Sequence, residues 1–215
     1  MKIILIGGGG HAKVVLDILL SLGPSGHEIV GYLDDAAEPE LRACRHLGRI
    51  DRLPDWFGPE TRLVCAIGNN RTRQAIVDSV NARILPAMVS ASPSDDGAWG
   101  TFIHPTACVS PFARLGAGTV VMPHAVVNAD AEVGAHCILN TGSIVEHDCR
   151  VDAFSHVSPN ATLCGKVKVG HTTHIGAGAT VLPGVAVGSR CIVGAGAVVV
   201  RSVPDNQRVK GVPAR

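Results

Sequence analysis

The sequence predicts two domains of different fold class: a small Rossmann-like α/β domain, followed by a parallel β-helix of hexapeptide repeats. Three observations carry this prediction. Only 3% of the 215 residues are aromatic although 46% are hydrophobic, glycine reaches 25 residues, and an aliphatic residue recurs at every sixth position from Ile103 to Val199. A core of stacked Val, Ile, Leu and Ala is typical of a repeat protein rather than of a layered globular domain.

The six-residue repeat is unbroken, and the residue two positions before each aliphatic residue is small from Ala107 onward. Three hexapeptides make one 18-residue coil, so each aliphatic side chain should point inward and stack on the residue 18 positions away. Glycine or asparagine often follows the aliphatic residue, and there we expect a turn with positive φ. The aliphatic residues are Ile103, Val109, Leu115, Val121, Val127, Val133, Leu139, Val145, Val151, Val157, Leu163, Val169, Ile175, Val181, Val187, Val193 and Val199.

Residues 1–85 alternate strand and helix patterns, which predicts a parallel sheet with Rossmann-like winding. Residues 86–100 are small, polar and rich in chain-breaking residues, and we interpret them as a linker to the β-helix domain, 101–215. The expected elements of the first domain are a strand Lys2–Ile6, a helix from about Ala12 to Leu22, strands Glu28–Leu33 and Arg62–Ile67, and a helix through Ile76 and Val80.

Charge and cysteine content exclude several classes of protein. A net charge of +1 indicates neither a nucleic-acid nor a membrane surface. The seven cysteines are odd in number and lack a C-x-x-C pair, which argues against a disulfide framework or a zinc site and suits a reducing cytosol. The apolar run before the first glycines is too short for a signal peptide or a membrane span. We therefore expect a cytoplasmic protein without a metal ion.

The triplet Glu146-His147-Asp148 departs from the repeat without a structural reason. An imidazole can accept a proton from an attacking amine or hydroxyl, and a neighbouring carboxylate can orient it. A surface histidine is the alternative interpretation. Gly165 lies one coil, or 18 residues, after His147 and would leave open space beside it, although a turn glycine explains it equally well. By the same count His156 and His174 lie on successive coils of one face.

The run Gly7–Ala12 satisfies G-x-G-x-x-A between a strand and a helix, so its backbone amides could approach a diphosphate at the helix N-terminus. Asp34, at the end of the next strand, could accept a hydrogen bond from a ribose or a base, although Asp34 and Asp35 could also form an ordinary solvated strand end. A dehydrogenase that binds NAD is the natural rival. The unit is only one mononucleotide half long, which argues against a dinucleotide.

From GGGGHAKVV through GYLDD, AIGNN, NTGSIVEHDC, SHVSPNATLCGKVKVG and the terminal GVPAR, the chain resembles the bacterial sugar acetyltransferases of the PglD and NeuD type over nearly its whole length. The resemblance implies a left-handed β-helix, acetyl-CoA as co-substrate, and an N-terminal domain that holds the nucleotide part of a nucleotide sugar. It also implies a homotrimer with each acetyl-CoA site between two subunits. The outward apolar residues Val126, Ile138, Ile144 and Val198 favour self-association as well.

The resemblance also implies roles for individual residues. His147 corresponds to the general base, Asp148 to the carboxylate that orients it, and Asn140 to a residue near the reacting amine. Acetyl-CoA would be bound by His156, Gly165, Ala177 and Ala195. The nucleotide sugar would be bound by Gly8, Gly9, Gly10, His11, Asp34, Asp35, Gly68 and Asn69.

We therefore expect an acetyl-CoA-dependent N-acetyltransferase that acts on the C4 amino group of a UDP-linked amino-deoxy sugar in bacterial glycan or glycoprotein biosynthesis. A GDP-linked, perosamine-type amino sugar and O-acetylation of sialic acid are alternatives within enzymes. A non-catalytic oligomeric scaffold is the alternative from another class.

Overall fold

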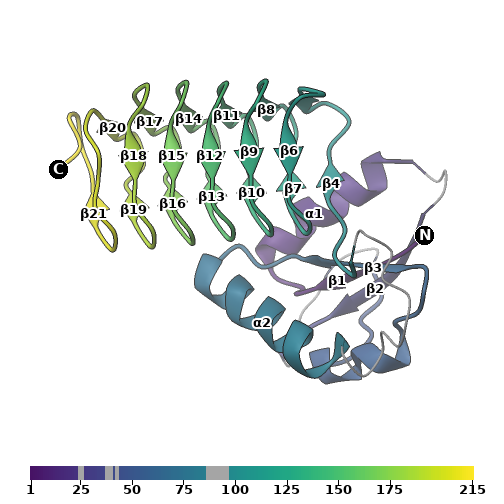
Figure 1. Ribbon diagram of the computed structural model, residues 1–215. Helices are drawn as coiled ribbons and strands as arrows, with labels where there is room; N and C mark the ends of the chain where they lie inside the picture. The colour runs from purple at the N-terminus through teal and green to yellow at the C-terminus, as the bar shows by residue number, and fades with distance from the viewer. Residues whose placement is uncertain (24–26, 37–40, 42–43, 86–96) are drawn as a thin grey trace. The chain divides into compact units, whose positions relative to one another are not determined.

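The computed structural model describes residues 1–23, 27–36, 41, 44–85 and 97–215 (Figure 1). The chain divides into two compact units, Met1–Thr101 and Phe102–Arg215. Within the described ranges, no helix has both the length and the apolar character needed to cross a bilayer.

The first unit is a small parallel α/β domain, as the sequence predicts. Its strands pair in the order β2-β1-β3, and β1 is buried at its centre because Ile3, Ile4, Leu5 and Ile6 are all apolar. After β1 the chain forms β2 on one side of β1 and then β3 on the other side. The strand order therefore reverses between β1 and β3, and α/β sheets bind ligands at the carboxyl ends of the strands at such a point. The elements are β1 (Lys2–Ile6), α1 (Gly10–Ser21), β2 (Glu28–Leu33), the 3₁₀ helix η1 (Ile50–Asp55), β3 (Thr61–Cys65) and α2 (Asn70–Arg83).

The segment 86–100, expected to be a linker, is described only from residue 97 onward. Residues 98–100 run along β3: the Leu63 amide donates to the Ala98 carbonyl at 2.8 Å, and the Gly100 amide donates to the Leu63 carbonyl at 2.9 Å. Between them Trp99 is buried, and its indole N–H donates to Asn81 Oδ1 at 2.8 Å. The end of this segment therefore extends the sheet of the first unit. Trp99 anchors it, because its indole is buried and its N–H has a hydrogen-bond acceptor.

The second unit is a parallel β-helix made of two-residue strands in three sheets (Figure 1). Over most of the β-helix, each strand pairs with the strand 18 residues further along the chain. Ile138, for example, pairs with His156. The strands are β4 (Phe102–Ile103), β5 (Cys108–Val109), β6 (Arg114–Leu115), β7 (Val120–Val121), β8 (Val126–Val127), β9 (Glu132–Val133), β10 (Ile138–Leu139), β11 (Ile144–Val145), β12 (Arg150–Val151), β13 (His156–Val157), β14 (Thr162–Leu163), β15 (Lys168–Val169), β16 (His174–Ile175), β17 (Thr180–Val181), β18 (Ala186–Val187), β19 (Ile192–Val193), β20 (Val198–Val199) and β21 (Arg208–Val209).

The core of the β-helix confirms the predicted double register. The aliphatic residue that ends each strand from Val121 to Val199 is buried, and so is the small residue two positions before it, such as Ala125, Cys137 or Ala161. Dispersion contacts between stacked aliphatic side chains and removal of apolar area from water stabilise this column at roughly 25 cal/mol per Å² buried. At the N-terminal end of the column, Ile103 and Val109 are only partly buried.

The expectation that glycines after the aliphatic residues adopt positive φ is wrong. Positive φ occurs two residues further on, once in every six residues, and includes non-glycine residues such as His136, Asp148 and Phe154. Gly116 and Gly134 have another reason to be glycine: a Cβ on either would lie 2.5 or 2.6 Å from the backbone nitrogen of Ala135 or Ala153 on the next coil. Close approach between coils, not backbone conformation, selects glycine there.

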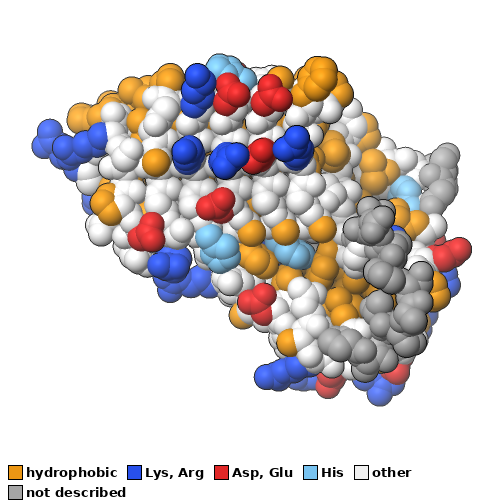
Figure 2. Space-filling view, in the orientation of Figure 1, with side chains coloured by type: hydrophobic (Ala, Val, Ile, Leu, Met, Phe, Trp, Pro, Cys, Tyr) orange, Lys and Arg blue, Asp and Glu red, His pale blue; other side chains and the backbone are white. Residues whose placement is uncertain are grey.

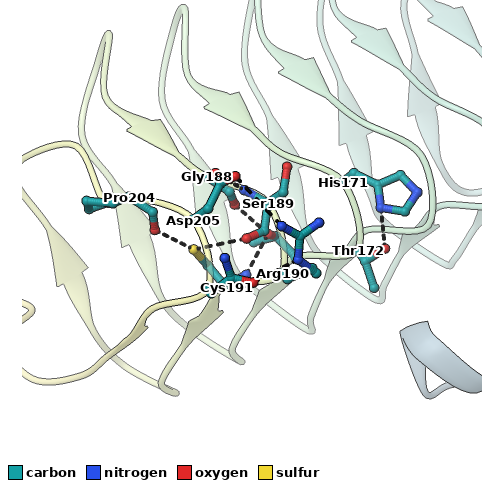
Figure 3. A network of polar contacts seen from close by, with 10 residues as sticks. His171, Thr172, Gly188, Ser189, Arg190, Cys191, Pro204 and Asp205 are labelled. Atoms are coloured by element: carbon teal, nitrogen blue, oxygen red, sulfur yellow. Dashed lines mark hydrogen bonds and ion pairs between the residues drawn. The ribbon is translucent and has the colours of Figure 1, made fainter.

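The end of the solenoid is closed by residues that follow β20 (Figure 3). Asp205 Oδ1 accepts a hydrogen bond from the Ser189 amide at 2.9 Å, and the Cys191 thiol donates to the Pro204 carbonyl at 3.0 Å. Arg190 Nε donates to Asn206 Oδ1 at 2.7 Å. These contacts attach residues 204–206 to the corner between β18 and β19.

Candidate active site

His147 and Asp148 form a hydrogen-bonded pair at the corner between β11 and β12. His147 Nδ1 lies 2.8 Å from Asp148 Oδ2, so the shorter aspartate side chain does reach the imidazole. Both side chains are about half exposed, and Glu146 Oε2 accepts the His147 amide at 3.3 Å. A carboxylate accepts the proton of Nδ1, which assigns the lone pair of the neutral ring to Nε2. The pair therefore has the arrangement of a base and its orienting group.

Gly165 provides the space into which the His147 ring points. A Cβ on Gly165 would lie 2.7 Å from both Cε1 and Nε2 of His147, and φ of Gly165 is not in the left-handed region. The Lys166 amide donates to the His147 carbonyl at 3.0 Å, which holds the two coils in register. Glycine is thus required here because the imidazole occupies the place of a side chain.

A second polar cluster forms around Asn140 and His156 at another corner. The Asn140 side-chain oxygen accepts the Thr141 amide at 2.8 Å, so its NH₂ group must donate to His156 Nε2, 3.0 Å away. His156 is therefore neutral, with its proton on Nδ1. His174 packs edge-on against His156 with ring centroids 4.9 Å apart, as the spacing of 18 residues predicts.

The predicted base and most of the predicted acetyl-CoA residues lie at different corners. Ala177 and Ala195 are exposed at the corner that follows the sheet of β10, on later coils than Asn140. His147 follows the sheet of β11, so the width of that sheet separates the two groups, on the order of 15 Å for extended chain. One chain does not bring them together, whereas Gly165 lies directly against His147.

In the first unit, Asp34 organises the glycine turn. Its Oδ2 accepts the Gly8 amide at 2.6 Å and its Oδ1 accepts the Ala36 amide at 2.8 Å. Asp35 Oδ1 accepts the Ile50 amide at 3.0 Å. Both carboxylates thus hold backbone amides in place, and the turn after β1 is attached to the end of β2. Asp34 is partly buried, whereas Asp35 remains exposed at the end of the strand.

The glycines of the turn after β1 have two different reasons to be glycine. Gly7 has φ +104°, and a Cβ there would lie 2.8 Å from Ile67 Cγ1, so backbone conformation and packing both require it. Gly9 and Gly10 have no positive φ, and a Cβ on either would meet nothing within 4 Å. Open space remains above the N-terminus of α1, where amides and the helix dipole favour a phosphate.

The loop after β3 completes this group of residues. Gly68 lies beside His11, and Asn69 caps α2 by accepting the Thr72 amide at 3.0 Å. Burial, with a smaller contribution from the positive charge of Arg73, lowers the pKa of His11 from its ordinary value to about 4. His11 is therefore a neutral imidazole near pH 7. Gly8, Gly9, Gly10, His11, Asp34, Asp35, Gly68 and Asn69 all lie at the carboxyl ends of the three strands.

Sequence patterns missed Arg73, which is 1% exposed inside α2. A helix with a polar face gives no signal that one of its arginines is buried. Across the described parts of the chain, no group of three or more His, Cys, Asp or Glu side chains could hold a metal ion.

Comparison with known families matches both units. Residues 2–80 match the PglD N-terminal domain, and residues 166–201 match the bacterial transferase hexapeptide (six repeats). Comparison with curated protein sequences gave no match.

Solved structures resemble the whole chain. The acetyltransferase domain of PglB from Neisseria gonorrhoeae FA1090, in complex with acetyl coenzyme A, is 38% identical with a TM-score of 0.86, and the match covers 100% of this chain and 98% of that one. PerB from Caulobacter crescentus, in complex with CoA and GDP-perosamine, is 40% identical with a TM-score of 0.86, covering 100% and 96%. WeeI from Acinetobacter baumannii AYE, 20% identical over 100% and 99% with a TM-score of 0.83, shares the fold.

Proposed function

Because the chain belongs to the PglD-type family of bacterial sugar acetyltransferases and is an acetyl-CoA-dependent N-acetyltransferase of nucleotide sugars, we propose that it acetylates the C4 amino group of a UDP-linked amino-deoxy sugar with His147 as general base. The observation that carries this proposal is the hydrogen bond between His147 and Asp148, with Nε2 directed over Gly165. Because the chain belongs to this class of enzymes, the alternative of a non-catalytic oligomeric scaffold is excluded.

The reaction follows from the chemistry of this pair. The sugar amine attacks the thioester carbonyl of acetyl-CoA, and His147 Nε2 accepts the proton that the nitrogen loses. Asp148 stabilises the imidazolium that forms. The tetrahedral intermediate collapses to the amide and releases CoA as a thiolate, which can take up the proton from His147.

A GDP-linked amino sugar is the second candidate, because the Caulobacter enzyme at 40% identity is described in complex with GDP-perosamine. The first unit would hold the diphosphate of either substrate at Gly9 and Gly10, where the structure leaves open space. Among the described residues of this unit, the sheet has one glycine turn and three strands, which supports a mononucleotide rather than NAD.

The substrate can be identified by measuring release of CoA with UDP-linked and GDP-linked 4-amino-dideoxy sugars, together with calorimetric titration of UDP, GDP and NAD. We expect kcat/KM to favour the UDP-linked sugar by about tenfold or more, and UDP to bind while NAD does not. Preference for the GDP-linked sugar would select the second candidate. Binding of NAD with no response to either sugar nucleotide would contradict both.

We also propose a homotrimer in which two subunits build each site. The face of β6, β9, β12 and β15 is charged, with Arg114 and Arg150 each 3.3 Å from Glu132 (Figure 2). The face of β8, β11 and β20 instead presents Val126, Ile144 and Val198, each partly exposed. Ile138, expected to be another outward apolar residue, is fully buried within the single chain. An apolar face between the two polar corners supports an interface that brings His147 of one chain to the Asn140 corner of another.

A mixture of two inactive variants should recover activity if sites are shared. His147→Ala removes the base, and Ala195→Leu places a larger side chain at the exposed corner that follows the sheet of β10. Random assortment at equal amounts should restore about one quarter of the sites. Mixed trimers that stay inactive would show that one chain builds the whole site. Gly165→Trp is unsuitable as the second variant, because Gly165 lies against His147 of the same chain.

A further inference from the structure

We propose that Arg73 is a positioning residue for the nucleotide sugar: its buried guanidinium holds the loop 67–70 against the glycine turn after β1. The inference deepens the proposed function of the first unit and rests on it. Arg73 lies in the first turn of α2, which begins at the carboxyl end of β3.

The guanidinium bridges three oxygen atoms of that loop. Arg73 Nη1 donates to the Ile67 carbonyl at 3.0 Å and to the Gly68 carbonyl at 3.2 Å. Its Nη2 donates to Asn70 Oδ1 at 2.8 Å. Arg73 is 1% exposed and Asn70 is 7% exposed, so these hydrogen bonds are protected from competing water. Three of the four residues 67–70 are therefore hydrogen-bonded to one buried side chain.

The loop that Arg73 holds packs against the proposed diphosphate site. A Cβ on Gly7 would strike Ile67 Cγ1, and a Cβ on Gly68 would lie 3.5 Å from His11 Cβ. Ile67 thus packs against Gly7 of the glycine turn, and Gly68 lies next to His11 in the first turn of α1. A shift of their carbonyls would move the turn, and with it the amides of Gly9 and Gly10.

A lysine at position 73 could not make the same hydrogen bonds as Arg73. A guanidinium is planar and presents several donors in a fixed fork, whereas an ammonium is a compact point charge on a flexible stem. Nη1 of Arg73 donates to the Ile67 carbonyl and Nη2 donates to Asn70 Oδ1. A single ammonium nitrogen cannot reach both acceptors in the same geometry. Arg73→Lys keeps the positive charge but should therefore not keep the conformation of residues 67–70.

Arg73 also places a buried positive charge next to His11. A guanidinium stays charged at physiological pH. Burial, with a smaller contribution from this charge, lowers the pKa of His11 to about 4 and so keeps the ring neutral. A diphosphate at the glycine turn would therefore face the N-terminus of α1 and a neutral His11, while the buried Arg73 acts on it only through the loop and at longer range.

The test compares Arg73→Lys and Arg73→Met with Arg71→Met, which removes an exposed arginine from the same turn of α2. Four quantities are measured on the full chain: KM for the sugar nucleotide, KM for acetyl-CoA, kcat, and the Kd of UDP and GDP. We expect Arg73→Lys to raise the sugar-nucleotide KM and the nucleotide Kd on the order of tenfold, the worth of a lost hydrogen bond or two. The acetyl-CoA KM and kcat should stay within about twofold, as should every quantity in Arg71→Met.

The outcomes are distinguishable. If Arg73→Met fails to fold, Arg73→Lys decides alone, with its acetyl-CoA KM as the measure of an intact β-helix. If Arg73→Lys lowers thermal stability but leaves the sugar-nucleotide KM and the nucleotide Kd at the wild-type values, Arg73 is only structural and the inference is wrong. If the wild-type chain itself binds neither UDP nor GDP, the proposed function of the first unit fails instead.

Discussion

Replacement of His147 with alanine is expected to lower kcat by about 10²–10⁴, the usual contribution of a positioned general base. The variant should remain folded, because the imidazole is about half exposed and its ring contacts are with Asp148 and the open side of Gly165. Steady-state kinetics with saturating sugar nucleotide and acetyl-CoA measure the loss. Both KM values should change little, since the base acts on the attacking amine and does not hold either substrate.

Asp148→Asn serves as the graded companion of this variant. It keeps the imidazole and removes only the charge that stabilises the imidazolium, so its loss of kcat should be smaller than that of His147→Ala. Asp152→Asn, an exposed acid on the same coil, is the matched control and should retain wild-type kcat. Turnover near the wild-type value in His147→Ala would remove the assignment of this residue as base.

The second large effect is expected from a single methyl group. In Gly165→Ala the new Cβ would lie 2.7 Å from His147 Nε2 and Cε1, so the imidazole must move. Displacement of a reacting group by about 1 Å costs on the order of 10² in rate. We expect kcat to fall by about that factor, with the thermal midpoint nearly unchanged because an exposed ring, not backbone, yields.

Two controls separate this effect from general damage. Pro183→Ala changes the equivalent position one coil further, where no imidazole lies, and should keep full activity. The double variant Gly165→Ala, His147→Ala should be no slower than His147→Ala alone, because both changes disable the same group. Additive losses would show that Gly165 acts through something other than His147.

The sequence alone predicts the fold class of both units and, in the β-helix, the stacking of residues 18 positions apart, whereas the strand order β2-β1-β3 comes from the structure. A period of six with a small residue two positions earlier leaves one way to bury the aliphatic side chains, and the structure has that core from Val121 to Val199. The strands Lys2–Ile6 and Glu28–Leu33 were predicted at their observed bounds, because each is a short apolar run that ends in a turn. Local patterns determine these features, and local patterns are visible in a sequence.

The sequence does not show why a residue type occurs at a position when the cause is a contact with a residue far away in the chain. The repeat pattern predicts positive φ for the glycines after the aliphatic residues, but in the structure the backbone of the next coil excludes a side chain at Gly116 and Gly134. Likewise, the sequence pattern predicts that Asp34 lies near a ribose or a base but gives no sign that both of its oxygens accept backbone amides. Two different physical causes can select the same residue type, and only the contacts distinguish them.

By itself the sequence determined the repeat, the two units, and the His147-Asp148 pair as the leading candidate for a base and its carboxylate. Only the tertiary structure decided that Asp148 reaches the imidazole, that His147 points over Gly165, and that the Asn140–His156 cluster lies at a different corner. It also decided that Arg73 is buried against the loop after β3. The physical reason is that periodicity specifies which residues point inward, whereas distances between side chains on different coils and loops depend on how the whole chain packs.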